Sequence, residues 1–113
     1  MRSLSKSLIV STFTLGLLAS IPAAQADETR ELVIKDHTFQ PAEITIPAKT
    51  KVKLVITNQD ATPEEFESHS MHREKVIPGG AKRTIVIGPL EPGTYEFFGE
   101  FNPKTAQGRV IVK

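Results

Sequence analysis

Short segments in which apolar and polar side chains alternate limit the fold of this chain more than any other feature. Residues 43–46 (EITI) alternate in this way, and in residues 51–57 (KVKLVIT) every second side chain is Val, Leu or Ile. A period of two is that of a half-buried β-strand. Four further segments have strand composition, namely residues 31–35, 84–87, 94–98 and 109–112. No segment is predicted to be a helix.

Turn-forming residues separate these segments. Residues 39–41 (FQP) are expected to form a bend, because proline fixes φ and cannot donate a backbone hydrogen bond. Turns or loops are expected at residues 47–50, 58–63, 78–80 and 89–93. The polar residues 64–71 fit no single class. About seven short strands at this spacing predict an all-β, antiparallel sandwich or barrel.

The first 26 residues have the pattern of a secretory signal peptide. Arg2 and Lys6 precede an apolar stretch at residues 8–18, and residues 24–26 (AQA) form a small-residue cleavage site. The alternative, an uncleaved anchor, is disfavoured because a span needs roughly 20 apolar residues. We therefore expect residues 1–26 to be removed and residues 27–113 to form one periplasmic domain.

Charge and cysteine content exclude several classes of protein. Residues 27–113 carry 12 Lys and Arg against 13 Asp and Glu, so charge favours neither nucleic acid nor an anionic membrane as a partner. The chain has no cysteine, so disulfides cannot stabilise it. Stability must come from strand pairing, apolar packing or a bound ion.

A series of short motifs along the chain resembles the cupredoxin superfamily. In order, these are residues 36–44 (DHTFQPAEI), 46–50 (IPAKT), 52–58 (VKLVITN), 77–80 (IPGG), 92–98 (PGTYEFF) and 108–112 (GRVIV). The resemblance covers essentially all of residues 27–113 and implies a cupredoxin-like Greek-key β-sandwich.

The copper ligands of that superfamily are missing. The resemblance places the first histidine ligand near Glu64 or Glu65, the cysteine at or near Gly99, and the second histidine near Asn102. A blue-copper centre needs a thiolate, which this chain cannot supply. An electron-transfer blue-copper protein is therefore excluded.

A narrower resemblance points to iron. Residues 64–67 (EEFE) resemble a Glu–aromatic–Glu element in the cupredoxin domain of EfeO-type periplasmic iron-uptake proteins, although those domains carry cysteines. Residues 99–103 (GEFNP) resemble small cupredoxins that accompany bacterial ferrous-iron permeases. The resemblance implies a protein that binds or oxidises ferrous iron, alone or with copper, for a membrane iron permease or a periplasmic iron-binding protein. The alternative is a metal-free β-sandwich that acts as a protein-interaction module.

The residues themselves suggest where an ion, iron or copper, would bind. If residues 65–71 are extended, Glu65, Glu67, His69 and Met71 share one face and Phe66 packs into the core on the other. Oxygen ligands suit Fe(II) or Mn(II). The competing interpretation is a solvated edge strand whose charges prevent aggregation.

Two further candidates complete the set. Glu100 follows the aromatic strand and would approach Glu65 in a cupredoxin sandwich. His72 joins Met71 and His69 in a His-Ser-Met-His run whose thioether and imidazole groups suit copper. His37 is expected to be a turn residue. No motif for nucleophilic catalysis is present, and whether the chain is an enzyme stays open.

Overall fold

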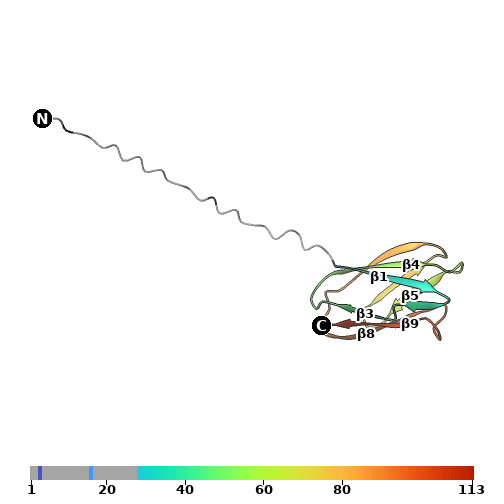
Figure 1. The fold of residues 1–113 in the computed structure, drawn as a ribbon. Coiled ribbons are helices and arrows are strands. Elements are labelled where there is room, and N and C mark those ends of the chain that lie inside the picture. Colours follow the sequence, from blue (N-terminus) through green and yellow to red (C-terminus); the bar gives the residue numbers. More distant parts are fainter. Residues whose placement is uncertain (1–2, 4–15, 17–27) are drawn as a thin grey trace.

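The fold is a sandwich of two β-sheets (Figure 1). The computed structural model describes residues 28–113 together with Ser3 and Gly16. Apart from these two residues, the expected signal peptide lies outside the described residues. The strands are β1 (Glu28–Lys35), β2 (Thr38–Gln40), β3 (Glu43–Ile46), β4 (Val52–Asn58), β5 (Glu64–Ser68), β6 (Arg73–Ile77), β7 (Lys82–Ile87), β8 (Gly93–Gly99) and β9 (Gln107–Val112). No described residue lies in a helix, so the described residues include no helix that could cross a membrane. The expected all-β class is confirmed.

The chain crosses repeatedly between the two sheets. The first sheet has the order β2-β1-β4-β7 and the second the order β3-β9-β8-β5-β6. The pairs β1–β4 and β3–β9 are parallel, and the other described pairs are antiparallel. The expected sandwich is present, but two of its seven described strand pairs are parallel where antiparallel pairing was expected. Antiparallel pairing was expected from the alternation of side chains, which has the same period in parallel and antiparallel strands.

Strands β2 and β6 lie where no strand was predicted, and β5 lies within the residues that fitted no single class. Residues 38–40, expected as part of a bend, form the edge strand β2. The turn before it places Asp36 and His37 at φ values of 53° and 57°, and both backbone N–H groups donate to the Asp60 carboxylate. Strand β6 shows no apolar–polar alternation because it is also an edge strand, with four of its five residues exposed. The structure thus has nine described strands where about seven were expected.

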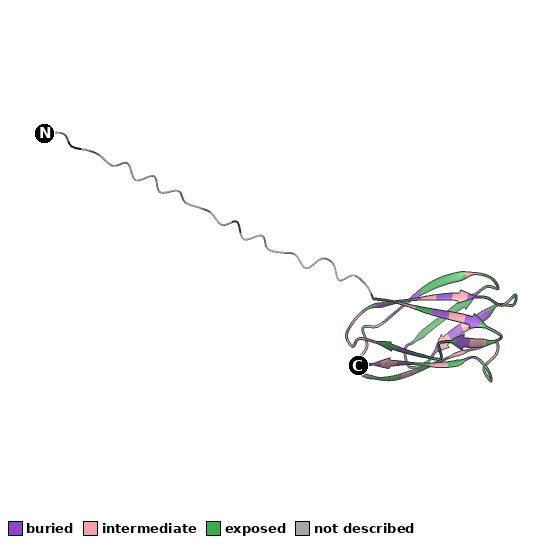
Figure 2. Ribbon diagram, viewed as in Figure 1, coloured by how far each residue is buried: buried purple, intermediate pink, exposed green. Residues whose placement is uncertain are grey.

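The core lies between the sheets, and buried residues alternate with more exposed ones along the strands (Figure 2). The rings of Phe39, Phe66 and Phe97 contact one another, with centroids 5.0–6.1 Å apart. Phe97 is buried while its neighbour Phe98 is half-buried on the outer face. Regular alternation through Phe66 and Phe97 therefore fixes which residues of β5 and β8 face outward.

Candidate metal centre

Strand β5 places adjacent glutamates on opposite sides of the second sheet. Glu64, Phe66 and Ser68 are buried, whereas Glu65 and Glu67 are half-buried on the outer face. Phe66 packs into the core as expected. The strand is flanked by β8 and β6, so the outward carboxylates have neighbours on both sides.

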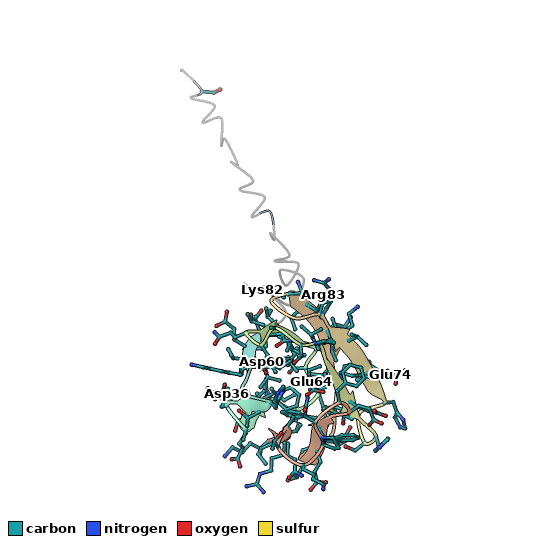
Figure 3. The ribbon with its side chains drawn as sticks, turned by 90° about the vertical axis from the view of Figure 1, so that its right-hand side faces the viewer. Asp36, Asp60, Glu64, Glu74, Lys82 and Arg83 are labelled. Carbon is teal, nitrogen blue, oxygen red and sulfur yellow. The ribbon has the colours of Figure 1, made fainter. Side chains whose placement is uncertain are left out.

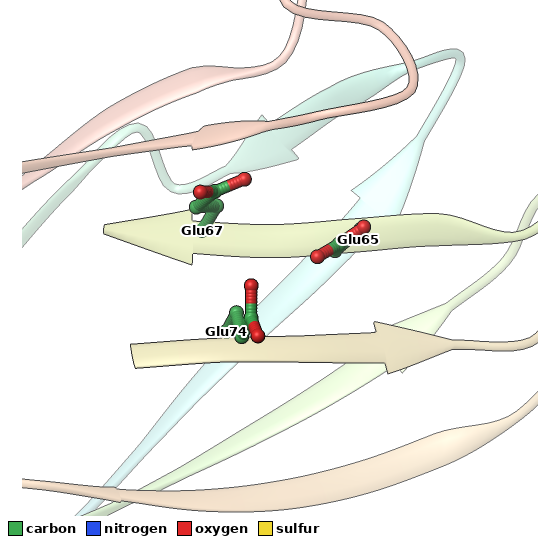
Figure 4. A group of neighbouring side chains, drawn as sticks. All are labelled: Glu65, Glu67 and Glu74. Carbon is green, nitrogen blue, oxygen red and sulfur yellow. The ribbon is translucent and has the colours of Figure 1, made fainter. Parts of the chain in front are cut away.

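Pairing with β6 adds a third glutamate to this face. In the antiparallel register Glu67 lies opposite Glu74, and residues directly opposite one another share a face. One carboxylate oxygen from each of Glu65, Glu67 and Glu74 lies within 4.8 Å of the others (Figure 4). Glu74 was not a predicted site residue. Recognising β5 and β6 as a hairpin and assigning its register would have been needed to find it.

Glu100 joins this cluster from the loop after β8. Its backbone N–H donates to the carbonyl oxygen of Glu65 at 2.9 Å, which fixes its main chain beside β5. Its side chain lies close enough to those of Glu65 and Glu67 to raise the pKa of both carboxyl groups. The sequence-predicted proximity of Glu100 to Glu65 is thus present. We call Glu65, Glu67, Glu74 and Glu100 the carboxylate cluster.

The surroundings of Glu65 and Glu67 disfavour ionisation of these two carboxyl groups. Partial burial raises the pKa of Glu65, and the charges of Glu74 and Glu100 raise it further. Partial burial also raises the pKa of Glu67, as do its hydrogen bond to Glu100 and the charge of that residue, while His69 acts in the opposite direction. Like charges held together destabilise the ionised state, and a bound cation would relieve that repulsion.

The predicted ligands beyond Glu67 lie in different surroundings. His69 is at the edge of the cluster, with its Nδ1 atom 3.9 Å from Oε1 of Glu67 and its ring against Phe98. His72 is exposed across the turn and, with Glu67 and Glu74, lines an open cleft of about 460 Å³. Met71 is buried in the core, only 5% exposed. The expectation that it shares a face with Glu65 is wrong, because β5 ends at Ser68 and the following turn breaks the alternation.

Near the positions where the resemblance places the copper ligands, the carboxyl group of Glu64 is buried and hydrogen-bonded (Figure 3 labels Glu64 and Glu74). Oε1 of Glu64 accepts a hydrogen bond from the backbone of Phe101 at 2.9 Å, and Oε2 accepts one from Nδ2 of Asn102 at 2.7 Å. A Cβ atom on Gly99 would lie 2.5 Å from Cδ of Glu64. These residues offer neither thiolate nor imidazole and leave no room for a side chain at Gly99, so they do not fit a blue-copper centre.

Comparison with known proteins decides the family. Residues 7–112 match a family model described as "Cupredoxin-like domain". The chain belongs to the cupredoxin-like family. The resemblance to cupredoxins noted in the sequence is therefore confirmed.

An uncharacterized protein of Rickettsia prowazekii (strain Madrid E) is similar in sequence to this cupredoxin-like chain. The two are 49% identical over 82 residues, which cover 73% of this chain and 66% of the relative. The chain thus spans about two thirds of the length of that relative.

Solved structures with similar folds include copper proteins. Auracyanin A, a "blue" copper protein from Chloroflexus aurantiacus, has a TM-score of 0.66 at 15% identity, covering 75% of this chain and 98% of its own. The metal-binding domain of the Cu(I)-exporting P-type ATPase of Streptococcus pneumoniae D39 has a TM-score of 0.64 at 16% identity, covering 75% and 84%. A purple cupredoxin from Nitrosopumilus maritimus has a TM-score of 0.56 at 21% identity, covering 74% and 98%. At these identities the likeness shows the fold alone.

Proposed function

We propose that this cupredoxin-like protein binds a divalent cation, ferrous iron foremost, on the carboxylate cluster. The observation that carries this proposal is the convergence of three carboxylate oxygens, from Glu65, Glu67 and Glu74, within 4.8 Å of one another. Glu100 supplies a fourth carboxylate beside Glu67. Burial and mutual repulsion make this arrangement unfavourable without a counter-charge, which supports a role beyond solubility.

The chemistry of the donor set supports iron more than copper. Carboxylate oxygens suit Fe(II) and Mn(II), whereas Cu(I) prefers thiolate and thioether ligands. His69 is the nearest imidazole, and Met71, the nearest thioether, is buried in the core. Negative charge also stabilises Fe(III) relative to Fe(II), so bound iron would lose an electron more readily to an external acceptor such as dioxygen.

The cellular setting of this proposal is iron uptake in the periplasm. It is supported by the signal-peptide pattern of residues 1–26 and by the resemblance of residues 64–67 and 99–103 to cupredoxins of ferrous-iron uptake systems. Under this proposal the protein captures ferrous iron and delivers it to an inner-membrane permease or to a periplasmic iron-binding protein.

Calorimetry of residues 27–113 under anaerobic conditions tests the binding proposal. We expect Fe(II) and Mn(II) to bind with micromolar or tighter affinity, and the Glu65→Gln variant to bind at least about tenfold more weakly because it loses a charged ligand. Glu31→Gln is the matched control, since Glu31 is exposed on β1 in the other sheet. Absence of binding of Fe(II), Mn(II) and Cu(II), or equal affinity in the two variants, would refute the proposal.

A second candidate function is docking of a basic protein without metal. It is favoured by two exposed apolar side chains, Val76 and Phe101, which are 47% and 49% exposed. Val76 lies opposite Glu65 in the register and Phe101 follows Glu100, so both border the carboxylate cluster. A metal-free protein that binds a basic partner and shows no increase in melting temperature with any divalent cation would favour this candidate.

A further inference from the structure

One buried acid, Glu64, lies outside the carboxylate cluster. Glu64 is 1% exposed, in contrast to its half-buried neighbour Glu65. Burying a carboxyl group is costly unless hydrogen bonds satisfy its oxygens. The partners of Glu64 therefore indicate what the residue does.

Two of its three partners belong to the loop that follows β8. Oε1 accepts from the backbone N–H of Phe101 at 2.9 Å and from that of Glu65 at 3.0 Å, and Oε2 accepts from Nδ2 of Asn102 at 2.7 Å. The loop closes on itself through hydrogen bonds from the backbone N–H groups of Asn102 and Ala106. The carboxyl group of Glu64 thus joins β5 to the start of a compact loop.

These contacts fix the residues on both sides of Glu100. Gly99 pairs with Phe66 in the β5–β8 register, and Phe101 is held by Glu64. Between them, the backbone N–H of Glu100 donates to the carbonyl oxygen of Glu65. The side chain of Glu100 is then left on the outer face, beside that of Glu67.

We propose that Glu64 is a positioning residue for the cation site: its buried carboxyl group holds residues 100–102 so that Glu100 faces Glu65 and Glu67. This inference rests on the proposed function. Glu64 itself does not touch the cation and acts only through Glu100.

The test compares Mn(II) affinity by calorimetry in four chains, namely wild type, Glu64→Gln, Glu100→Gln and the double variant. Glutamine keeps the size of Glu64 but replaces one acceptor oxygen with an amide group, and it removes the charge that attracts the donors of Phe101 and Asn102. Because residues that orient metal ligands typically contribute about 10- to 100-fold to affinity, we expect a loss of that order in Glu64→Gln. The double variant should bind no more weakly than Glu100→Gln alone, because Glu64 acts through Glu100.

Two controls separate positioning from general destabilisation. Glu31→Gln should retain wild-type affinity. Asn102→Ala removes only the 2.7 Å hydrogen bond to Oε2 and should weaken Mn(II) binding in the same direction by a smaller factor, which keeps the test usable if Glu64→Gln does not fold.

The possible failures are distinguishable. A folded Glu64→Gln protein with wild-type affinity, beside a weakened Glu100→Gln, would overturn the positioning role and leave the cation function intact. Losses that multiply in the double variant would show that Glu64 does not act through Glu100. A wild-type chain that binds no cation would overturn the proposed function, and hydrogen exchange at the amides of Glu100 and Phe101 would then still report whether Glu64 holds the loop.

Discussion

At the scale of single residues, two adjacent glutamates serve different purposes because a strand alternates its side chains. Glu64 faces inward and is fully hydrogen-bonded, whereas Glu65 faces outward among other carboxylates. The outward direction of Glu65 could be predicted from the sequence, because the aromatic side chain of Phe66 indicates which face of the strand is the core. The sequence did not reveal the role of Glu64, whose partners Phe101 and Asn102 are 37 and 38 positions away.

The raised pKa of Glu65 predicts a pH-dependent effect on stability. A carboxyl group whose pKa is higher in the folded than in the unfolded chain contributes stability below the unfolded value, and that contribution is lost as pH rises through the folded value. At pH 7 the ionised side chain therefore destabilises the metal-free fold. We expect Glu65→Gln to raise the melting temperature by a few degrees at pH 7, and the gain to disappear below about pH 4.

Thermal unfolding of metal-free protein across this pH range checks the expectation, with Glu31→Gln as the comparison. A Glu65→Gln variant that is less stable than wild type at pH 7 would show that the carboxylate makes a net favourable interaction in the fold.

At the scale of elements, the candidate site is a property of strand register. The pairing of β5 with β6 brings Glu74 to Glu67, and the end of β8 brings Glu100 to Glu65. Periodicity in the sequence predicts the individual strands with alternating or β-rich segments. It cannot predict which residues of two strands are opposite, and it fails for edge strands such as β6, where both faces are exposed.

The close approach of β5 and β8 predicts a strict size limit at Gly99. A Cβ atom there would lie 2.5 Å from Cδ of Glu64 and 2.7 Å from Cβ of Ala106. Relief of these contacts requires movement of the loop, because Glu64 is buried and hydrogen-bonded. We expect Gly99→Ala to destabilise the protein by about 1–3 kcal/mol, the usual cost of overpacking.

Chemical denaturation measures this change, with Gly80→Ala as a control in a turn where no atom lies within 4 Å of the added Cβ. Gly80 has a φ of 71°, so its own backbone cost must be subtracted. Equal denaturation midpoints for Gly99→Ala and wild type would contradict the close approach.

At the scale of the whole molecule, the chain shares its fold with copper proteins but has no cysteine. Motif order along the chain was sufficient to predict a cupredoxin-like sandwich, since motifs follow the sequence of strands and turns. The parallel pairs and the extra edge strands were not predictable, because they depend on how the chain crosses between sheets. The proposed cation site therefore lies on the outer face of β5 and β6 rather than at the position expected for blue copper.

Paramagnetic broadening of backbone amide signals by substoichiometric Mn(II) tests this location most directly. If the carboxylate cluster binds the cation, the nuclear magnetic resonance signals of Glu65, Glu67, Glu74 and Glu100 broaden first, and Glu65→Gln reduces the effect. Broadening centred elsewhere, for example at the turn of His37 and Asp60, or no selective broadening at all, would contradict a cation site on the carboxylate cluster.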